Sequence, residues 1–163
     1  MNPPSLSTLS LSLEQGIAEI RLNRPDKSNA MNDAMWQEIR QAFDWVDATP
    51  EARVAILSGA GRNFCAGIDL TLLAGIQQRI AHPDAARSRE ALRRLILDLQ
   101  DCLSSVERCR KPVLAAIQGA CIGGALDLVT SCDMRYAAAD AVFSVREIDL
   151  GMVADVGTLQ RLP

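Results

Sequence analysis

The sequence predicts an α/β fold in which a unit of strand, glycine turn and helix repeats along the chain. Two short, continuous apolar runs, 54–57 and 113–117, are typical of strands that are buried on both faces. Each run leads into a glycine-containing loop and then into residues with helical periodicity, as at 125–132. We therefore expect buried strands that pack against helices.

The first third of the chain predicts a hairpin followed by a long helix. Residues 1–8 are rich in Ser and Pro, and we expect a disordered lead there. Apolar residues alternate over 9–13 and 17–22 on either side of a break, which is a hairpin signal. Asn32 is suited to cap a helix that ends near Thr49. The apolar stripe of this helix is Met35, Trp36, Ile39, Phe43 and Val46.

Two further helices and two short strands are expected beyond residue 63. One helix reaches about Ile80, and Asp84 caps the next. The second carries an apolar stripe of core or interface type, formed by Leu92, Leu95, Ile96, Leu99 and Leu103. Strands are expected at 134–137 and 141–145, followed by a loop that enters a helix near Thr158.

Composition excludes several classes of partner. With 17 basic and 20 acidic residues the net charge is -3, which gives no field to attract nucleic acid. No apolar run approaches the length of a membrane span.

Five cysteines without C-x-x-C spacing predict reduced, buried thiols, and the first ten residues lack the features of a targeting peptide. We therefore expect a cytoplasmic location. We expect no metal site, because His82 is the single histidine and has no second candidate ligand nearby.

The glycine turn after the strand at 113–117 is the first candidate site. The first turn of a helix has unpaired backbone N–H groups, which favour negative charge. No Lys-Ser/Thr pair follows Gly124, and the spacing is not G-x-G-x-x-G, so we set both nucleotide motifs aside. The remaining use is an oxyanion hole, in which a glycine lets a substrate carbonyl approach. Close packing at a tight turn explains the spacing equally well.

Three acidic residues are candidates for proton transfer. Asp127, Glu147 and Asp155 lie among apolar residues, which raise the proton affinity of a carboxylate. Simpler roles are also open, because Asp127 suits the first turn of its helix and Asp155 could cap the next one. We expect Arg146 to point away from Glu147 on an extended segment, so that the two do not neutralise each other.

Two stretches carry a family resemblance. Asn63-Phe-Cys-Ala-Gly-Ile-Asp-Leu70 and Gly119-Ala-Cys-Ile-Gly-Gly-Ala-Leu-Asp127 resemble the paired oxyanion-hole motifs of the enoyl-CoA hydratase/isomerase (crotonase) family. Within the family, residues 143–163 are most similar to the delta(3,5)-delta(2,4)-dienoyl-CoA isomerases, which Asp155 separates from the hydratases. The resemblance implies a crotonase-like spiral of repeated ββα units over 9–163. It also implies an acyl-CoA-binding core that lacks the C-terminal helical part.

The resemblance also implies roles for individual residues. The backbone N–H groups of Ile68 and Gly124 would hold the thioester oxygen, Asp155 would remove a proton from C2, and Glu147, tuned by Asp127, would deliver one at C6. Further substrate-binding positions by resemblance are Lys27, Cys65, Ala66, Gly67, Asp69 and Gly123. No cofactor is implied, since coenzyme A is part of the substrate, and a homo-oligomer (trimer or hexamer) is typical of the family.

The implied reaction converts a 3,5-dienoyl-CoA into a 2,4-dienoyl-CoA in fatty acid β-oxidation. One alternative is an enoyl-CoA hydratase, because Asp127 and Glu147 stand where hydratases of the family carry glutamates. A second alternative, of another class, is a non-catalytic fragment that binds acyl-CoA or mediates oligomerisation.

Overall fold

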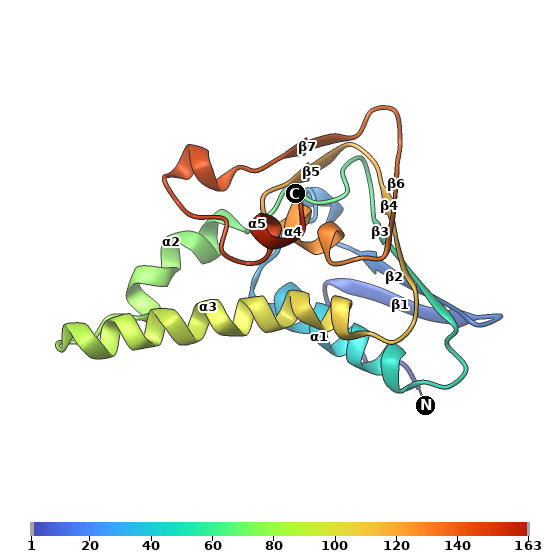
Figure 1. Cartoon of the computed structure of the whole chain (residues 1–163), viewed down its shortest axis with the longest axis horizontal. Coiled ribbons are helices and arrows are strands. Elements are labelled where there is room, and N and C mark those ends of the chain that lie inside the picture. Colours follow the sequence, from blue (N-terminus) through green and yellow to red (C-terminus); the bar gives the residue numbers. More distant parts are fainter. Residues whose placement is uncertain (1, 163) are drawn as a thin grey trace.

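The computed structural model describes residues 2–162 and contains a five-stranded sheet and a two-stranded sheet (Figure 1). The larger sheet has the order β1 (Leu9–Glu14), β2 (Ile17–Leu22), β3 (Val54–Gly59), β4 (Val113–Ile117) and β6 (Met134–Ala137). The smaller sheet pairs β5 (Ala120–Ile122) with β7 (Val142–Ser144). β1 and β2 form the expected antiparallel hairpin, and every other pairing is parallel.

The α-helices are α1 (Asp33–Ala48), α2 (Leu70–Arg79), α3 (Ala85–Arg108), α4 (Gly124–Thr130) and α5 (Thr158–Arg161). Two short 3-10 helices are η1 (Pro25–Lys27) and η2 (Glu147–Leu150). Helix α1 packs against β1 and β2 of the larger sheet, and α4 packs against β5 of the smaller one. α1 and α3 pack against each other along the lower side of the view in Figure 1, whereas α4 and α5 lie together near the C-terminus.

The helix α1 confirms the sequence prediction closely. The side chain of Asn32 accepts a hydrogen bond of 3.0 Å from the N–H of Met35, which is the predicted cap. All five residues of the predicted apolar stripe are buried in the core. Asp84 caps α3 in the same way, through the N–H of Ala86 at 2.8 Å.

Two local predictions are wrong. β5 lies within what we expected to be only a glycine turn, because three residues are too few to show a period. Arg146 is not extended but helical, and it precedes the 3-10 helix that begins at Glu147. Its guanidinium pairs with Asp149 at 2.6 Å, so it still does not neutralise Glu147.

The N-terminal lead, which we expected to be disordered, contacts α1. Glu38 is buried and accepts hydrogen bonds from the N–H and hydroxyl groups of both Ser7 and Thr8, at 2.5 to 2.8 Å. The Nε1 group of Trp45 donates to the carbonyl of Asn2 at 3.0 Å. The lead therefore has specific partners on one helix.

The cysteines and helices of residues 2–162 also bear on the composition analysis. All five cysteines are free, and all except the half-buried Cys109 are buried, as predicted. In this part of the chain, no helix combines the length and the apolar character that crossing a membrane requires.

Candidate active site

A cavity of about 440 Å³ lies between α3, α2 and the loop after β7. Its apolar wall includes four residues of the predicted α3 stripe (Leu92, Leu95, Ile96 and Leu99) together with Leu73 and Ile76 of α2. Ile68, Gly124, Glu147 and Asp155 line the same cavity. The stripe that we assigned to core or interface thus forms the wall of a site that holds two of the predicted acids.

The two recognised motifs meet because the segment at 64–68 runs parallel to β5. The N–H of Cys65 donates to the carbonyl of Ala120 at 2.9 Å, and the N–H of Ile122 donates back to the carbonyl of Cys65 at 3.1 Å. A Cβ atom added to Gly67 would lie only 2.6 Å from the carbonyl oxygen of Ile122. Only glycine allows this close approach.

The predicted oxyanion-hole donors have free backbone N–H groups. Within residues 2–162, neither the N–H of Ile68 nor that of Gly124 donates a hydrogen bond to another group of the chain. Each follows a glycine in the left-handed region, Gly67 at φ +89° and Gly123 at φ +54°. Two similar turns therefore present an unpaired N–H beside the same cavity, as an oxyanion hole requires.

The reason that we gave for glycine at position 124 is wrong. A Cβ atom on Gly124 would lie 2.8 Å from Cε of Met31 and 3.4 Å from Cη2 of Trp36, both buried. The absent side chain therefore makes room for the core and not for a substrate carbonyl. The neighbouring Gly123 faces the site instead, because its Cβ would lie 3.1 Å from Oε1 of Glu147.

Asp127 is fully buried, on α4. Its Oδ1 atom accepts a hydrogen bond of 2.5 Å from the N–H of Thr158, whereas Oδ2 has no partner in the described part of the chain. Burial raises the pKa of this carboxyl, and the hydrogen bond from Thr158 opposes the effect. Burial also raises the pKa of Glu147, and the charges of Asp127 and Asp155 raise it further.

Asp155 is exposed at the rim of the cavity. Among residues 2–162 its carboxylate has neither a hydrogen-bond donor nor an ion-pair partner. The residue that precedes α5 is Gly157, which provides no side-chain cap, so a capping role for Asp155 is wrong. The residue is free to act on a molecule in the cavity.

The other predicted substrate-binding side chains do not line the cavity. Cys65 is buried, with its thiol 3.0 Å from the carbonyl of Asn29, and burial raises its pKa to about 12. Asp69 caps α2 and pairs with Arg24 at 3.0 Å. Lys27 is exposed on η1. The N–H of Ala66 donates to the carbonyl oxygen of Ser28 at 2.9 Å, so the segment at 64–68 is bonded to the loop after η1.

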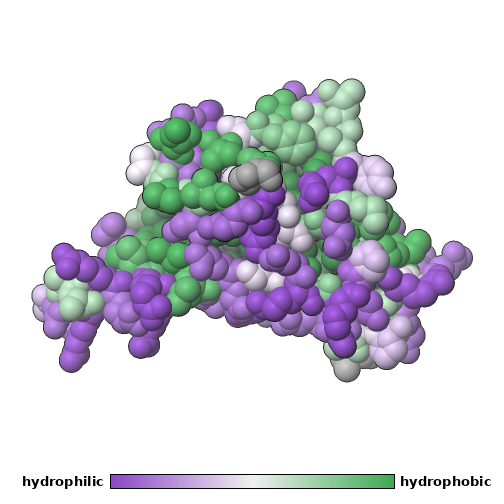
Figure 2. Space-filling view, in the orientation of Figure 1, coloured by the Kyte–Doolittle hydropathy of each residue, from purple (hydrophilic) through white to green (hydrophobic). Residues whose placement is uncertain are grey.

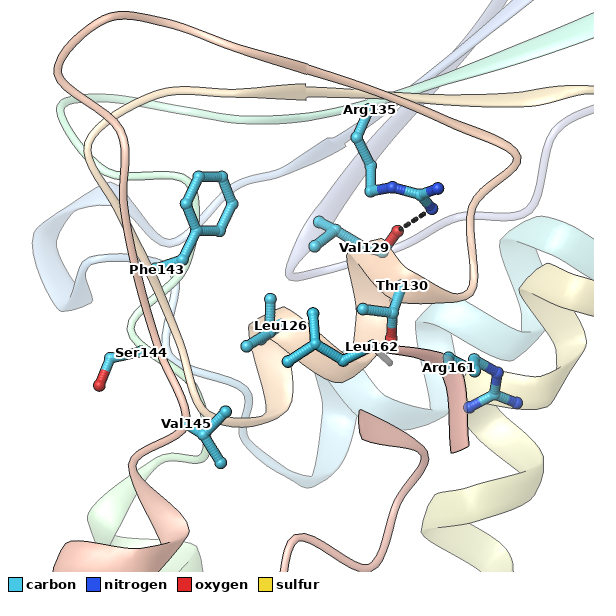
Figure 3. Close-up of a pocket in the computed structure, with 9 residues that line it drawn as sticks. All are labelled: Leu126, Val129, Thr130, Arg135, Phe143, Ser144, Val145, Arg161 and Leu162. Atoms are coloured by element: carbon cyan, nitrogen blue, oxygen red, sulfur yellow. Dashed lines mark hydrogen bonds between the residues drawn. The ribbon is translucent and has the colours of Figure 1, made fainter. Parts of the chain in front are cut away.

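A second hollow, of about 390 Å³, lies beside α4 (Figure 3). It is mainly apolar, with Leu126, Phe143 and Leu162 pointing into it. Arg135 lies at its edge and donates to the carbonyl of Val129 at 3.2 Å. None of the predicted site residues lines it, so the first cavity is the candidate site.

Comparison with known proteins agrees with this geometry. The sequence profile of the enoyl-CoA hydratase/isomerase family matches residues 12–163. The chain belongs to this family. Its crotonase fold is shared with the crystal structure of an enoyl-CoA hydratase from Shewanella pealeana, at a TM-score of 0.83 and 28% identity over 94% of this chain and 55% of that one.

Two curated relatives are dienoyl-CoA isomerases. The chain is 46% identical to the peroxisomal delta(3,5)-delta(2,4)-dienoyl-CoA isomerase of Arabidopsis thaliana, over 98% of this chain and 58% of the relative. It is 47% identical to the mitochondrial delta(3,5)-delta(2,4)-dienoyl-CoA isomerase of Homo sapiens, over 93% of this chain and 46% of the relative. This family member therefore spans about half the length of these relatives.

The same relatives contradict the prediction of a cytoplasmic location, which is wrong. One is named as peroxisomal and the other as mitochondrial. Free, buried cysteines indicate a compartment that keeps thiols reduced. They do not distinguish the cytosol from other such compartments, which is why the sequence argument failed.

Besides the α3 stripe and the α2 residues of the cavity wall, sequence analysis missed Trp36 and Gln100 as contributors to the site. Trp36 was assigned only to the core, yet it also lines the cavity. Gln100, on α3, donates a hydrogen bond to the backbone of Asp155 at 2.5 Å. No sequence signal distinguishes Gln100 from any other polar residue on the outer face of a helix.

Proposed function

We propose that this protein is an isomerase that converts a 3,5-dienoyl-CoA into the conjugated 2,4-dienoyl-CoA. The observation that carries the proposal is that Glu147 and Asp155 line one apolar cavity together with the free N–H groups of Ile68 and Gly124. The two dienoyl-CoA isomerases, at 46% and 47% identity, support it.

In the proposed mechanism, the thioester oxygen accepts hydrogen bonds from Ile68 and Gly124. The carboxylate of Asp155 takes a proton from C2, and the electron pair of that C–H bond delocalises into the diene and the thioester oxygen. The two N–H groups stabilise the resulting dienolate. Glu147 then donates its proton to C6, so that the double bonds move from positions 3 and 5 to positions 2 and 4.

The different surroundings of Glu147, which is half-buried, and Asp155, which is exposed, support this division of roles. Glu147 must start protonated, and the same burial that raises its pKa favours the protonated form. Asp127 adds to this effect from beneath the cavity. The apolar wall from α3 suits an acyl chain. The route uses carboxyl groups and backbone donors of the chain and requires neither a metal nor a redox cofactor.

We also propose that the protein forms a homo-oligomer, as the family resemblance implies. Figure 2 shows apolar surface in the upper part of the molecule, and Ile148, Leu150 and Val153 around η2 are exposed. Contiguous apolar surface favours association. Sedimentation at several protein concentrations tests this, and a monomer throughout would contradict it.

A spectroscopic assay tests the reaction. We expect absorbance from a conjugated dienoyl-CoA to rise when the protein is mixed with a 3,5-dienoyl-CoA. A loss of enoyl absorbance from a 2-enoyl-CoA, without the first reaction, would favour the hydratase, which the similarity to an enoyl-CoA hydratase structure keeps open. Binding without either change would favour a non-catalytic acyl-CoA-binding module.

A further inference from the structure

The loop that carries Asp155 has little to hold its backbone in place. In the described part of the chain, residues 153–156 make no backbone–backbone hydrogen bond, either as donors or as acceptors. The loop is packed at Ala154, which is buried, and at Val156, which contacts the core. Neither of these apolar contacts provides a hydrogen bond to the backbone of Asp155.

One side chain supplies the missing hydrogen bond. Nε2 of Gln100 donates to the carbonyl oxygen of Asp155 at 2.5 Å, across 55 residues of sequence. Among residues 2–162, this is the one hydrogen bond made by residues 153–156. The helix α3 therefore holds the loop at Asp155, a residue that lines the cavity.

Gln100 itself does not reach the cavity. It lines an outer hollow, with Ser104, Glu107 and Gln160, on the far side of Asp155. Asp155 and Val156 line both spaces and so lie between them. The side-chain hydrogen bond of Gln100 ends on Asp155, so Asp155 is the residue through which Gln100 can act on a bound substrate by hydrogen bonding.

We propose that Gln100 is a positioning residue that holds the carboxylate of Asp155 at the distance and angle needed for proton removal. The proposal rests on the proposed function of Asp155 and adds to it a residue on a different element. Misplacing a catalytic group by a fraction of an ångström lowers turnover while substrate binding persists. Gln100 should consequently affect kcat and not KM.

The decisive variant is Gln100→Met, which keeps the length of the side chain and removes the donor. Its matched control is Gln160→Met, since Gln160 is exposed, lines the same outer hollow and makes no side-chain hydrogen bond within residues 2–162. We expect kcat for a 3,5-dienoyl-CoA to fall about threefold to tenfold in Gln100→Met, the value of one hydrogen bond. KM should change less than about twofold, and Gln160→Met should behave as the unmodified protein.

A double-mutant cycle tests whether Gln100 acts through Asp155. In an Asp155→Asn background, Gln100→Met should cause no further loss of turnover, because the group that it positions is gone. An equal loss in both backgrounds would show a general structural effect and overturn the proposal. Unchanged turnover in the single Gln100→Met variant would also overturn it.

Limited proteolysis provides a readout that does not depend on activity. Thermolysin cuts before apolar residues such as Val153 and Val156, and mass spectrometry locates the cuts. We expect cleavage there to be about threefold to tenfold faster in Gln100→Met and unchanged in Gln160→Met. Equal cleavage in all three proteins would show that the Gln100 hydrogen bond does not hold the loop.

If the unmodified protein lacks isomerase activity, the proposed function fails, and proteolysis still decides whether Gln100 holds the loop. Should Gln100→Met fail to fold, Gln100→Ala replaces it.

Discussion

The carboxylate of Asp127, on α4, accepts a hydrogen bond of 2.5 Å from the backbone N–H of Thr158, the first residue of α5. Gly157, which precedes α5, has no side chain to cap the helix. Asp127 therefore supplies, from another element, an acceptor for one of the N–H groups that the first turn of a helix leaves unpaired. The same carboxyl lies beneath the candidate site and raises the pKa of Glu147.

Replacement of Asp127 by Asn should raise stability at neutral pH. Because burial raises the pKa of Asp127 above its usual 3.8, the folded state binds this proton more tightly than the unfolded state, and stability falls as pH rises through the window above 3.8. Asn keeps the acceptor for Thr158 and carries no charge. Thermal midpoints should favour Asp127→Asn near pH 7 and converge below about pH 4. A difference that is constant with pH would contradict this.

Replacement of Asp155 by Asn should remove activity and spare stability. Its carboxylate has no partner within residues 2–162, so folding loses little. Turnover of a 3,5-dienoyl-CoA and deuterium exchange at C2 should both fall by about 10²- to 10⁴-fold. The control is Asp149→Asn, an exposed acid of η2 that does not line the cavity, which should retain turnover. Full activity in Asp155→Asn would exclude it as the base.

Replacement of Glu147 by Gln should separate the two proton transfers. C2 exchange should persist in part, while product formation falls by about 10²-fold or more, since the donor for C6 is lost. In the unmodified protein, turnover should fall as pH rises through the raised pKa of Glu147, because only the protonated acid can donate. Equal loss of C2 exchange in both acid variants would argue against separate roles.

Replacement of Gly124 by Ala should lower the free energy of unfolding, because the added side chain meets the core. The added methyl group would lie 2.8 Å from Cε of Met31, the flexible end of a buried side chain, so that end must move, at a cost of about 1 kcal/mol. Gly75→Ala is the matched control, because no atom lies within 4 Å of its added Cβ. That variant should gain about 0.5–1 kcal/mol as an α2 interior position. Denaturant unfolding of both variants measures the contrast, and equal stability would contradict the packing argument.

Replacement of Glu38 by Gln should loosen the N-terminal lead. Burial opposes ionisation of Glu38, but its hydrogen bonds from Ser7 and Thr8 outweigh that effect and lower its pKa below 4.5. The stability that it contributes is therefore present above pH 4.5 and is lost as pH falls through the lowered pKa. Glu38→Gln should cost about 1–3 kcal/mol at neutral pH, with a difference that shrinks in acid. Unfolding followed from pH 2.5 to 7 tests this.

Local patterns made much of the fold predictable. The stripe of α1 and its Asn32 cap depend on residues three or four positions apart, and the hairpin depends on alternation around one turn. The two glycine motifs could also be recognised from the sequence. β5 was not, because a three-residue strand is defined by its partners and not by its own composition.

The sequence by itself determined the hairpin, the longer helices, the buried strands, the family and the identity of the candidate acids, because each depends on neighbouring residues or on short motifs. Only the tertiary structure decided that the missing side chain of Gly124 leaves room for Met31. The same is true of the hydrogen bond from Thr158 to Asp127 and of the hydrogen bond from Gln100 to Asp155. The last two contacts join residues 31 and 55 positions apart in the chain. Such pairs form only when strands and helices pack, since no spacing in the sequence brings them together.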